Sequence, residues 1–325
     1  MNKVRYLQAL NQALRDEMAR DPSVFMLGED IRVSLRGLTK GLLDEFGPER
    51  ILDAPISEAA WTGFATGAAL AGRRPVLEVQ IPSMLFLAFE QIVNQAQKIR
   101  LMTGGQAKVP VTYLIPGTGA RLGLAAHHSD NPYPMFMNGG VKCVMPATAD
   151  DAYGLTLSAI RDDDPVMIFA PSAALGKREE ADNPFEAVPL GKGRLRREGT
   201  DVTLLATGHL VFEAVALSDK LRDENISIEV FDPRTLFPMD YELLAESVSK
   251  TGRLVIVDDS NWTCGFAADV AANIVDLCWS DLKAPIKRVT RYDAPIPFAV
   301  PLEQAVVASI SLAEARIREV LRERR

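Results

Sequence analysis

The sequence predicts an α/β protein of two domains, each with three layers, in which helices cover both faces of a mainly parallel sheet. Three observations predict this class. Short apolar runs alternate with helical patterns along the chain. One charged segment with two prolines interrupts the alternation, which then restarts. The 325 residues are long for one domain and comfortable for two.

The predicted strands of the first domain are apolar throughout, which is typical of strands buried on both faces of a sheet. They span residues 23–27, 75–80, 109–115, 141–146 and 165–170. Apolar residues at helical spacing occupy the first 20 residues, and further helical patterns lie at 58–72, 86–102 and 150–161.

The segment 172–189 has no apolar period and is predicted to be an interdomain linker. We place the first domain with its linker at 1–187 and the second domain at 188–325. Strands of the second domain are predicted in the runs DVTLLATG, ISIEVFD, RLVIVDD and IKRVTRY. Its helices are predicted at about 210–224, in DYELLAESVSK and FAADVAANIVDLCW, and from about Leu302 onward.

The composition is that of an ordinary soluble globular protein, with 47% hydrophobic and 24% charged residues. A net charge of −7 argues against binding to nucleic acid and to anionic membranes. No apolar run is long enough to cross a bilayer, and the first residues resemble neither a signal nor a transit peptide. Three cysteines without a CxxC pair predict neither disulfides nor a zinc site. We therefore expect a cytoplasmic protein with reduced thiols.

Common phosphate-binding and nucleophile motifs are absent from the sequence. No GxGxxG follows a strand, and neither GxxxxGK[ST] nor GxSxG occurs. The chain is therefore not expected to bind a diphosphate by itself.

Glu58 opens a predicted helix that carries no other charge from Ala59 to Gly72. One interpretation is that Ser57 and Glu58 cap this helix, and ordinary capping preferences favour it. The alternative is catalytic. Burial on so apolar a helix would raise the pKa of the carboxyl and suit it to share a proton with a ring nitrogen.

Two of the three histidines, His127 and His128, are adjacent in a polar loop that contains proline. Such a pair is either catalytic or has no function. In an extended loop, adjacent side chains point to opposite sides. His209 is predicted to start a helix. The segment 159–166, AIRDDDPV, is a solvated helix end or a site where backbone carbonyls bind a cation.

Together, the motifs resemble one family over nearly the whole chain: the β subunits of thiamine diphosphate-dependent 2-oxo acid dehydrogenases. This family includes the β chains of pyruvate, branched-chain 2-oxo acid and acetoin dehydrogenases. The motifs are MLGEDI, ILDAPISEAAWTGFATGAALAG, FEQIVNQAQKIRLMTGG, AAHHSD, AIRDDDPV and VFDPRTLFPMD. The resemblance implies a pyrimidine-binding domain, a transketolase-like C-terminal domain, and a heterotetramer of two α and two β chains.

The resemblance also assigns roles to residues. Glu58 matches the glutamate that hydrogen-bonds the pyrimidine ring of thiamine diphosphate. His128 matches the channel histidine that orients substrate and transfers protons, while His127 stands where the family usually has glutamine. The α subunit is expected to supply the Mg²⁺ and diphosphate site. Backbone carbonyls that match a structural K⁺ site are those of Val111, Ala159, Ile160, Asp162 and Asp164.

Some residues depart from the family pattern. Met84 stands where a Phe or Tyr commonly packs against the pyrimidine, and Met can still fill that space. Leu114 replaces a common Arg, and Gly139–Gly140 replace the usual Pro-Gly. We expect these changes to lie near the cofactor and the substrate channel, and to bear on the substrate rather than on the fold.

The predicted function is that of a β subunit that cleaves a 2-oxo acid or acyloin and passes the acyl unit to a lipoyl acyltransferase partner. An alternative is a subunit of a carboligase or of a diketone- or acyloin-cleaving enzyme without a lipoyl partner. A third reading, from another class, is a non-catalytic assembly subunit. Retention of both Glu58 and His128 argues against that third reading.

Overall fold

The computed structural model describes residues 3–120, 123–180 and 186–323. The chain divides into two compact units. The N-terminal unit comprises Met1–Leu122 and His127–Leu190, and the C-terminal unit comprises Gly123–Ala126 and Gly191–Arg325.

The N-terminal unit contains a parallel sheet with the strand order β6-β7-β5-β4-β2-β3. Its strands are β2 (Val24–Gly28), β3 (Ile51–Asp53), β4 (Arg74–Glu78), β5 (Thr112–Thr118), β6 (Lys142–Val144) and β7 (Val166–Pro171). Every residue of β2, β5 and β7 is buried, as the apolar runs predict.

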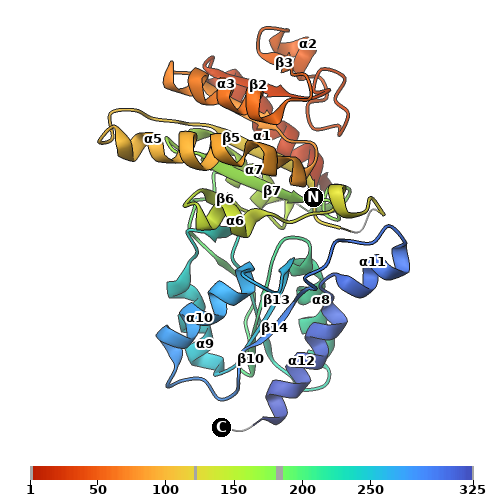
Figure 1. Ribbon diagram of the computed structural model, residues 1–325. Coiled ribbons are helices and arrows are strands. Elements are labelled where there is room, and N and C mark those ends of the chain that lie inside the picture. Colours follow the sequence, from red (N-terminus) through yellow and green to blue (C-terminus); the bar gives the residue numbers. More distant parts are fainter. Residues whose placement is uncertain (1–2, 121–122, 181–185, 324–325) are drawn as a thin grey trace. The chain divides into compact units, whose positions relative to one another are not determined.

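Helices cover both faces of this sheet (Figure 1). On one face α1 (Tyr6–Arg20) packs against α7 (Ala149–Arg161), and their apolar residues join those of the strands in one buried core. On the other lie α3 (Glu58–Leu70) and a long helical stretch. The short helices α2 (Leu42–Phe46), η1 (Pro82–Met84), η3 (Ala126–His128) and α6 (Tyr133–Asn138) lie in the connections.

The long helical stretch predicted at 86–102 changes its hydrogen-bonding pattern twice. It consists of α4 (Leu85–Glu90), a π-helical segment η2 (Gln91–Ala96) and α5 (Gln97–Met102). A short strand that the apolar pattern does not reveal also lies in the predicted linker. This strand, β8 (Arg178–Glu180), pairs antiparallel with β1 (Lys3–Arg5).

The C-terminal unit contains a second sheet with the order β14-β13-β10-β11-β9. All its neighbours are parallel except β9, which runs antiparallel to β11. The strands are β9 (Arg194–Arg197), β10 (Val202–Ala206), β11 (Ile228–Asp232), β13 (Leu254–Asn261) and β14 (Lys287–Arg291), and the short β12 (Thr235–Phe237) follows β11.

Helices again lie on both faces of this sheet, with α9 and α10 on one and α8 and α12 on the other (Figure 1). Their bounds are α8 (Leu210–Arg222), α9 (Tyr241–Thr251), α10 (Phe266–Cys278), α11 (Val300–Val306) and α12 (Ile310–Arg322). The single C-terminal helix expected from Leu302 is therefore two helices, whereas His209 precedes α8 as predicted. None of the described helices is both long and apolar enough to span a membrane.

Candidate active site

Three candidate site residues of the N-terminal unit lie where its strands end. Glu29 directly follows β2, Glu58 lies a few residues after β3, and Met84 follows β4. These three strands are neighbours in the order β4-β2-β3. Ligands of parallel α/β sheets bind at the carboxyl ends of the strands, so this edge is the candidate active site.

Glu58 is the first residue of α3, and only 5% of its surface is exposed. Ser57, at the N-cap, makes no side-chain capping bond, so the capping interpretation receives no support from Ser57. Within the described part of the chain, no group hydrogen-bonds the Glu58 carboxylate. A buried carboxylate without such a partner fits a nitrogen donor supplied by a ligand.

Glu29 is a candidate site residue that the sequence analysis did not identify. Burial raises the pKa of its carboxyl, and the negative charges of Glu58 and Asp30 raise it further, while the indole N–H of Trp61 opposes the shift. Glu29 and Glu58 are therefore close enough to repel each other. The signal in the sequence was an acidic residue immediately after a buried strand, in the motif MLGEDI.

Gln80 holds the backbone of Glu29 in place. Its Nε2 donates to the Glu29 carbonyl at 3.1 Å and to Oε1 of Glu78 at 2.9 Å. Arg36 in turn donates to the Gln80 side chain at 3.1 Å and to its carbonyl at 2.9 Å. Burial raises the pKa of Glu78 to about 7, although Gln80 and Arg36 act in the opposite direction. A buried polar network thus supports the acidic loop from the end of β4.

Gly28 allows this loop to begin so close to β4. A Cβ atom at this position would lie 2.6 Å from the carbonyl oxygen of Glu78. Any side chain larger than hydrogen would therefore push β2 away from β4, and it would displace Glu29, the next residue, with it.

The two adjacent histidines lie in η3, and both are exposed. The expectation of an extended loop with opposed side chains was wrong. A 3₁₀ turn has three residues per turn, so neighbouring side chains diverge by about 120° rather than 180°. Ser83, in η1, donates a hydrogen bond from Oγ to the carbonyl of His127. The structure therefore brings the segment that carries half-buried Met84 against the histidine loop.

Leu114 is one of the departures from the family pattern, and the structure places it in the interior. Leu114 is fully buried in β5 and belongs to the hydrophobic core shared with Leu10, Leu14 and Val144. An apolar residue at this position completes a core contact. Gly139–Gly140 are another departure from the family pattern. Gly140 has φ of +80°, a conformation that favours glycine.

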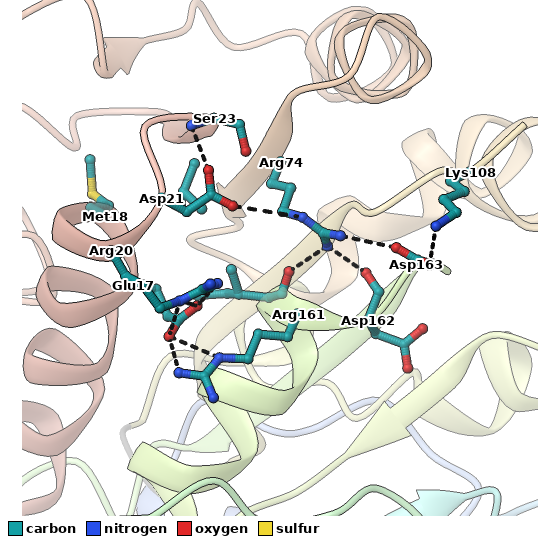
Figure 2. Close-up of polar contacts among 12 residues, drawn as sticks. Glu17, Met18, Arg20, Asp21, Ser23, Arg74, Lys108, Arg161, Asp162 and Asp163 are labelled. Atoms are coloured by element: carbon teal, nitrogen blue, oxygen red, sulfur yellow. Dashed lines mark hydrogen bonds and ion pairs between the residues drawn. The ribbon is translucent and has the colours of Figure 1, made fainter.

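The carbonyls expected to bind K⁺ lie at the opposite edge of the sheet, where β4 and β7 begin. Nη1 of Arg74 donates to the carbonyls of Ile160 and Asp162, both at 2.9 Å, and its Nη2 donates to Asp163 at 2.9 Å (Figure 2). The Val111 carbonyl accepts the Val166 N–H at 3.0 Å, as part of the sheet. An arginine charge thus already faces two of the five predicted ligands.

Ion pairs surround this carbonyl cluster. Lys108 and Arg74 both contact Asp163 and lower its pKa. Nearby, Glu17 of α1 has only 1% of its surface exposed and accepts hydrogen bonds from Arg20 and Arg161 (Figure 2). Burial alone would raise the pKa of Glu17, but the two arginines hold it below its ordinary value. These contacts tie α1, α7 and β4 together at the edge opposite the candidate active site.

Known protein families match both units. The transketolase pyrimidine-binding domain matches residues 2–177, and the transketolase C-terminal domain matches residues 191–311. A solved structure described as a split-gene transketolase, inactive β4 tetramer, has the same fold, with a TM-score of 0.81, 24% identity and full coverage of both chains. The class is therefore that of transketolase-like proteins with these two domains in one chain.

Curated relatives show which family of transketolase-like proteins the chain belongs to. The β subunit of acetoin:2,6-dichlorophenolindophenol oxidoreductase from Bacillus subtilis is 39% identical, over 91% of this chain and 90% of its own. The pyruvate dehydrogenase E1 β subunit of Rickettsia felis is 39% identical over 94% of both chains. The 2-oxoisovalerate dehydrogenase β subunit of B. subtilis is 37% identical, over 98% and 99%. The chain belongs to this family, the β subunits of thiamine diphosphate-dependent 2-oxo acid dehydrogenases.

Proposed function

We propose that this chain supplies the pyrimidine-activating half of an active site that cleaves a 2-oxo acid or acetoin. The observation that carries the proposal is the buried carboxylate of Glu58. Glu58 is the first residue of a helix without other charges, and a second, half-buried acid, Glu29, interacts with it. When bound, thiamine diphosphate would supply the nucleophile and the electron sink that cleavage next to a carbonyl requires.

Glu58 would hold a proton at the pyrimidine ring nitrogen. Its burial excludes water from that hydrogen bond, and the apolar face of α3 strengthens the interaction by lowering the local dielectric. Met84 would pack against the ring, because its flexible thioether fills irregular space and contacts aromatic faces well.

His128 would orient the substrate and carry a proton during acyl transfer. Its exposure in η3 supports this role, because a proton carrier must reach both substrate and solvent. The side chain of His127 has no proposed role. The contact that His127 makes with Ser83 uses its backbone carbonyl.

The active complex is proposed to be a cytoplasmic heterotetramer of two α and two β chains. Relatives named as β subunits support an α partner, which would supply the Mg²⁺ and the diphosphate site. Activity is proposed to require this partner, and a lipoyl acyltransferase is the proposed acceptor of the acyl unit.

We also propose a structural K⁺ ion on the carbonyls of Val111, Ala159, Ile160, Asp162 and Asp164. Each carbonyl oxygen has two lone pairs and can therefore serve Arg74 and a cation together.

A second candidate acts on an acyloin or diketone without a lipoyl partner. The relative named for acetoin and an artificial dye acceptor favours this candidate. The two candidates differ in the acceptor and share the roles of Glu58 and His128.

The experiment is co-expression with the α subunit, followed by a substrate screen with an artificial electron acceptor. Pyruvate, branched-chain 2-oxo acids, acetoin and diketones form the panel, each with and without a lipoyl domain. We expect turnover of at least one compound, which the β chain alone does not show. No turnover of any compound by a complex that binds thiamine diphosphate would contradict the proposal.

A further inference from the structure

A hydrogen bond joins two segments of the candidate site that are 44 residues apart. The hydroxyl of Ser83, in the turn after β4, donates to the backbone carbonyl of His127. That carbonyl belongs to the peptide unit whose nitrogen is that of His128. The bond therefore fixes the orientation of the peptide plane from which the His128 side chain projects.

Among the described residues, the N-terminal side of the histidine loop has one other side-chain contact, from the Gly123 N–H to Oε1 of Glu303 at 3.4 Å. η3 contains only one turn, and both of its histidines are exposed, so side-chain packing does not hold them. Ala125, just before the turn, has φ of +62°, which is unfavourable for alanine and requires surrounding contacts to maintain it.

The C-terminal side of His128 is anchored separately. Ser129 is fully buried, and the Gly119 N–H donates to the Asp130 carbonyl at 3.0 Å. His128 thus lies between a buried anchor that follows it and the Ser83 contact that precedes it.

We infer that Ser83 is a positioning residue for His128. This inference rests on the proposed function, because it takes His128 as the proton carrier of the channel. Ser83 also precedes Met84, so one short turn places both the side chain proposed to pack on the pyrimidine and the histidine loop. The hydroxyl of Ser83 acts through the loop and does not touch the reacting atoms.

The test uses the assembled αβ complex with thiamine diphosphate and the best substrate from the screen. The variants are Ser83→Ala, Ser83→Thr, His128→Ala and the double variant Ser83→Ala/His128→Ala. Ser249→Ala is the matched control, because it also removes a serine hydroxyl that donates a hydrogen bond, to Asp281 at 2.6 Å, but at an exposed position of α9 in the C-terminal unit. Turnover is measured across pH, together with exchange of the cofactor's thiazolium proton and backbone hydrogen exchange in the loop 123–131.

We expect Ser83→Ala to lower kcat about tenfold, a factor that corresponds to the free energy of one hydrogen bond. The variant should also speed backbone hydrogen exchange in the loop. Ser83→Thr, which keeps the hydroxyl, should stay within about twofold of the wild type. In the His128→Ala background, Ser83→Ala should cause no further loss, because there is no imidazole left to position. Thiazolium exchange should be unchanged in all of these variants, and Ser249→Ala should match the wild type.

An equal loss from Ser83→Ala with and without His128 would overturn the inference, as would full activity of Ser83→Ala. Both results leave the proposed function intact, provided that His128→Ala itself is impaired. An unimpaired His128→Ala would overturn the role of His128 and, with it, the inference. A wild-type complex without thiazolium exchange would instead contradict the proposed function.

Discussion

Glu29 and Glu58 interact through their charges, since burial together with the negative charge of Glu58 raises the pKa of Glu29. Two acids at the ends of neighbouring strands thus share one partly dry environment. Because two close carboxylates resist being ionised together, one of them holds its proton at a higher pH than an isolated glutamate.

The first prediction tests this coupling. Glu58→Gln removes the negative charge and keeps the size of the side chain, so the pKa of Glu29 should fall toward its ordinary value. The midpoint can be followed by infrared titration of protonated carboxyl bands, with Glu29→Gln used to assign the band. An unchanged midpoint in Glu58→Gln would show that the two acids do not interact.

The second prediction concerns the histidine pair. His128→Ala should reduce transfer to a lipoyl domain more than it reduces turnover with an artificial acceptor, because only the former needs the full proton relay. General acid–base contributions are about 10²- to 10⁴-fold, which sets the scale of the expected loss. His127→Ala should do less, since the backbone carbonyl of His127 makes its contact with Ser83. Equal losses in the two variants, compared in parallel assays, would contradict this assignment.

The third prediction concerns potassium. If the carbonyls near Arg74 hold K⁺, the melting temperature should be higher in KCl than in NaCl at equal ionic strength, because a cage of carbonyls discriminates by ion size and field strength. Thermal melts in the two salts provide the measurement. Identical melting temperatures would indicate that Arg74 alone supplies the positive charge that these carbonyls need.

The fourth prediction concerns stability and pH. Glu17→Gln should lower the free energy of unfolding by about 1–2 kcal/mol at pH 7, because Arg20 and Arg161 lose a buried charged partner. Since folding lowers the pKa of Glu17, its ionised form stabilises the protein above the unfolded-state pKa of about 4.3. That stabilisation is lost as the pH falls through the lower folded-state pKa.

Denaturant titrations at pH 7 and at pH 3 measure this effect. The difference between wild type and Glu17→Gln should shrink at the lower pH. The control is Glu45→Gln, which removes an exposed ion pair with Arg15 and should cost less than about 1 kcal/mol. A difference of the same size at both pH values would show that the ionisation of Glu17 does not contribute.

The sequence predicted those features that depend on local pattern. Apolar runs located the main strands. A charge-free helix after an acid made Glu58 a candidate, but this pattern favoured capping, and the catalytic role came from the family resemblance. The pattern could not show contacts between distant segments. The Ser83–His127 bond, the Glu29–Glu58 pair and the approach of Arg74 to the end of α7 all join residues far apart in the chain.

Leu114 also shows that a local pattern does not reveal what surrounds a residue in the fold. Comparison with a family pattern marked Leu114 as a departure expected near the channel, and only the structure shows that its side chain belongs to a core between helices and sheet. The location of a residue along a strand does not by itself reveal which face of the sheet it occupies when both faces are apolar.

The central claim is that Glu58 activates the cofactor through its pyrimidine ring. It is tested most directly by exchange of the thiazolium proton in deuterated buffer, measured on the assembled complex of α and β subunits. Glu58→Gln should slow this exchange by about 10²-fold or more, and turnover should fall alike with every substrate and every acceptor. His128→Ala should leave the exchange unchanged. Normal exchange in Glu58→Gln would contradict the account.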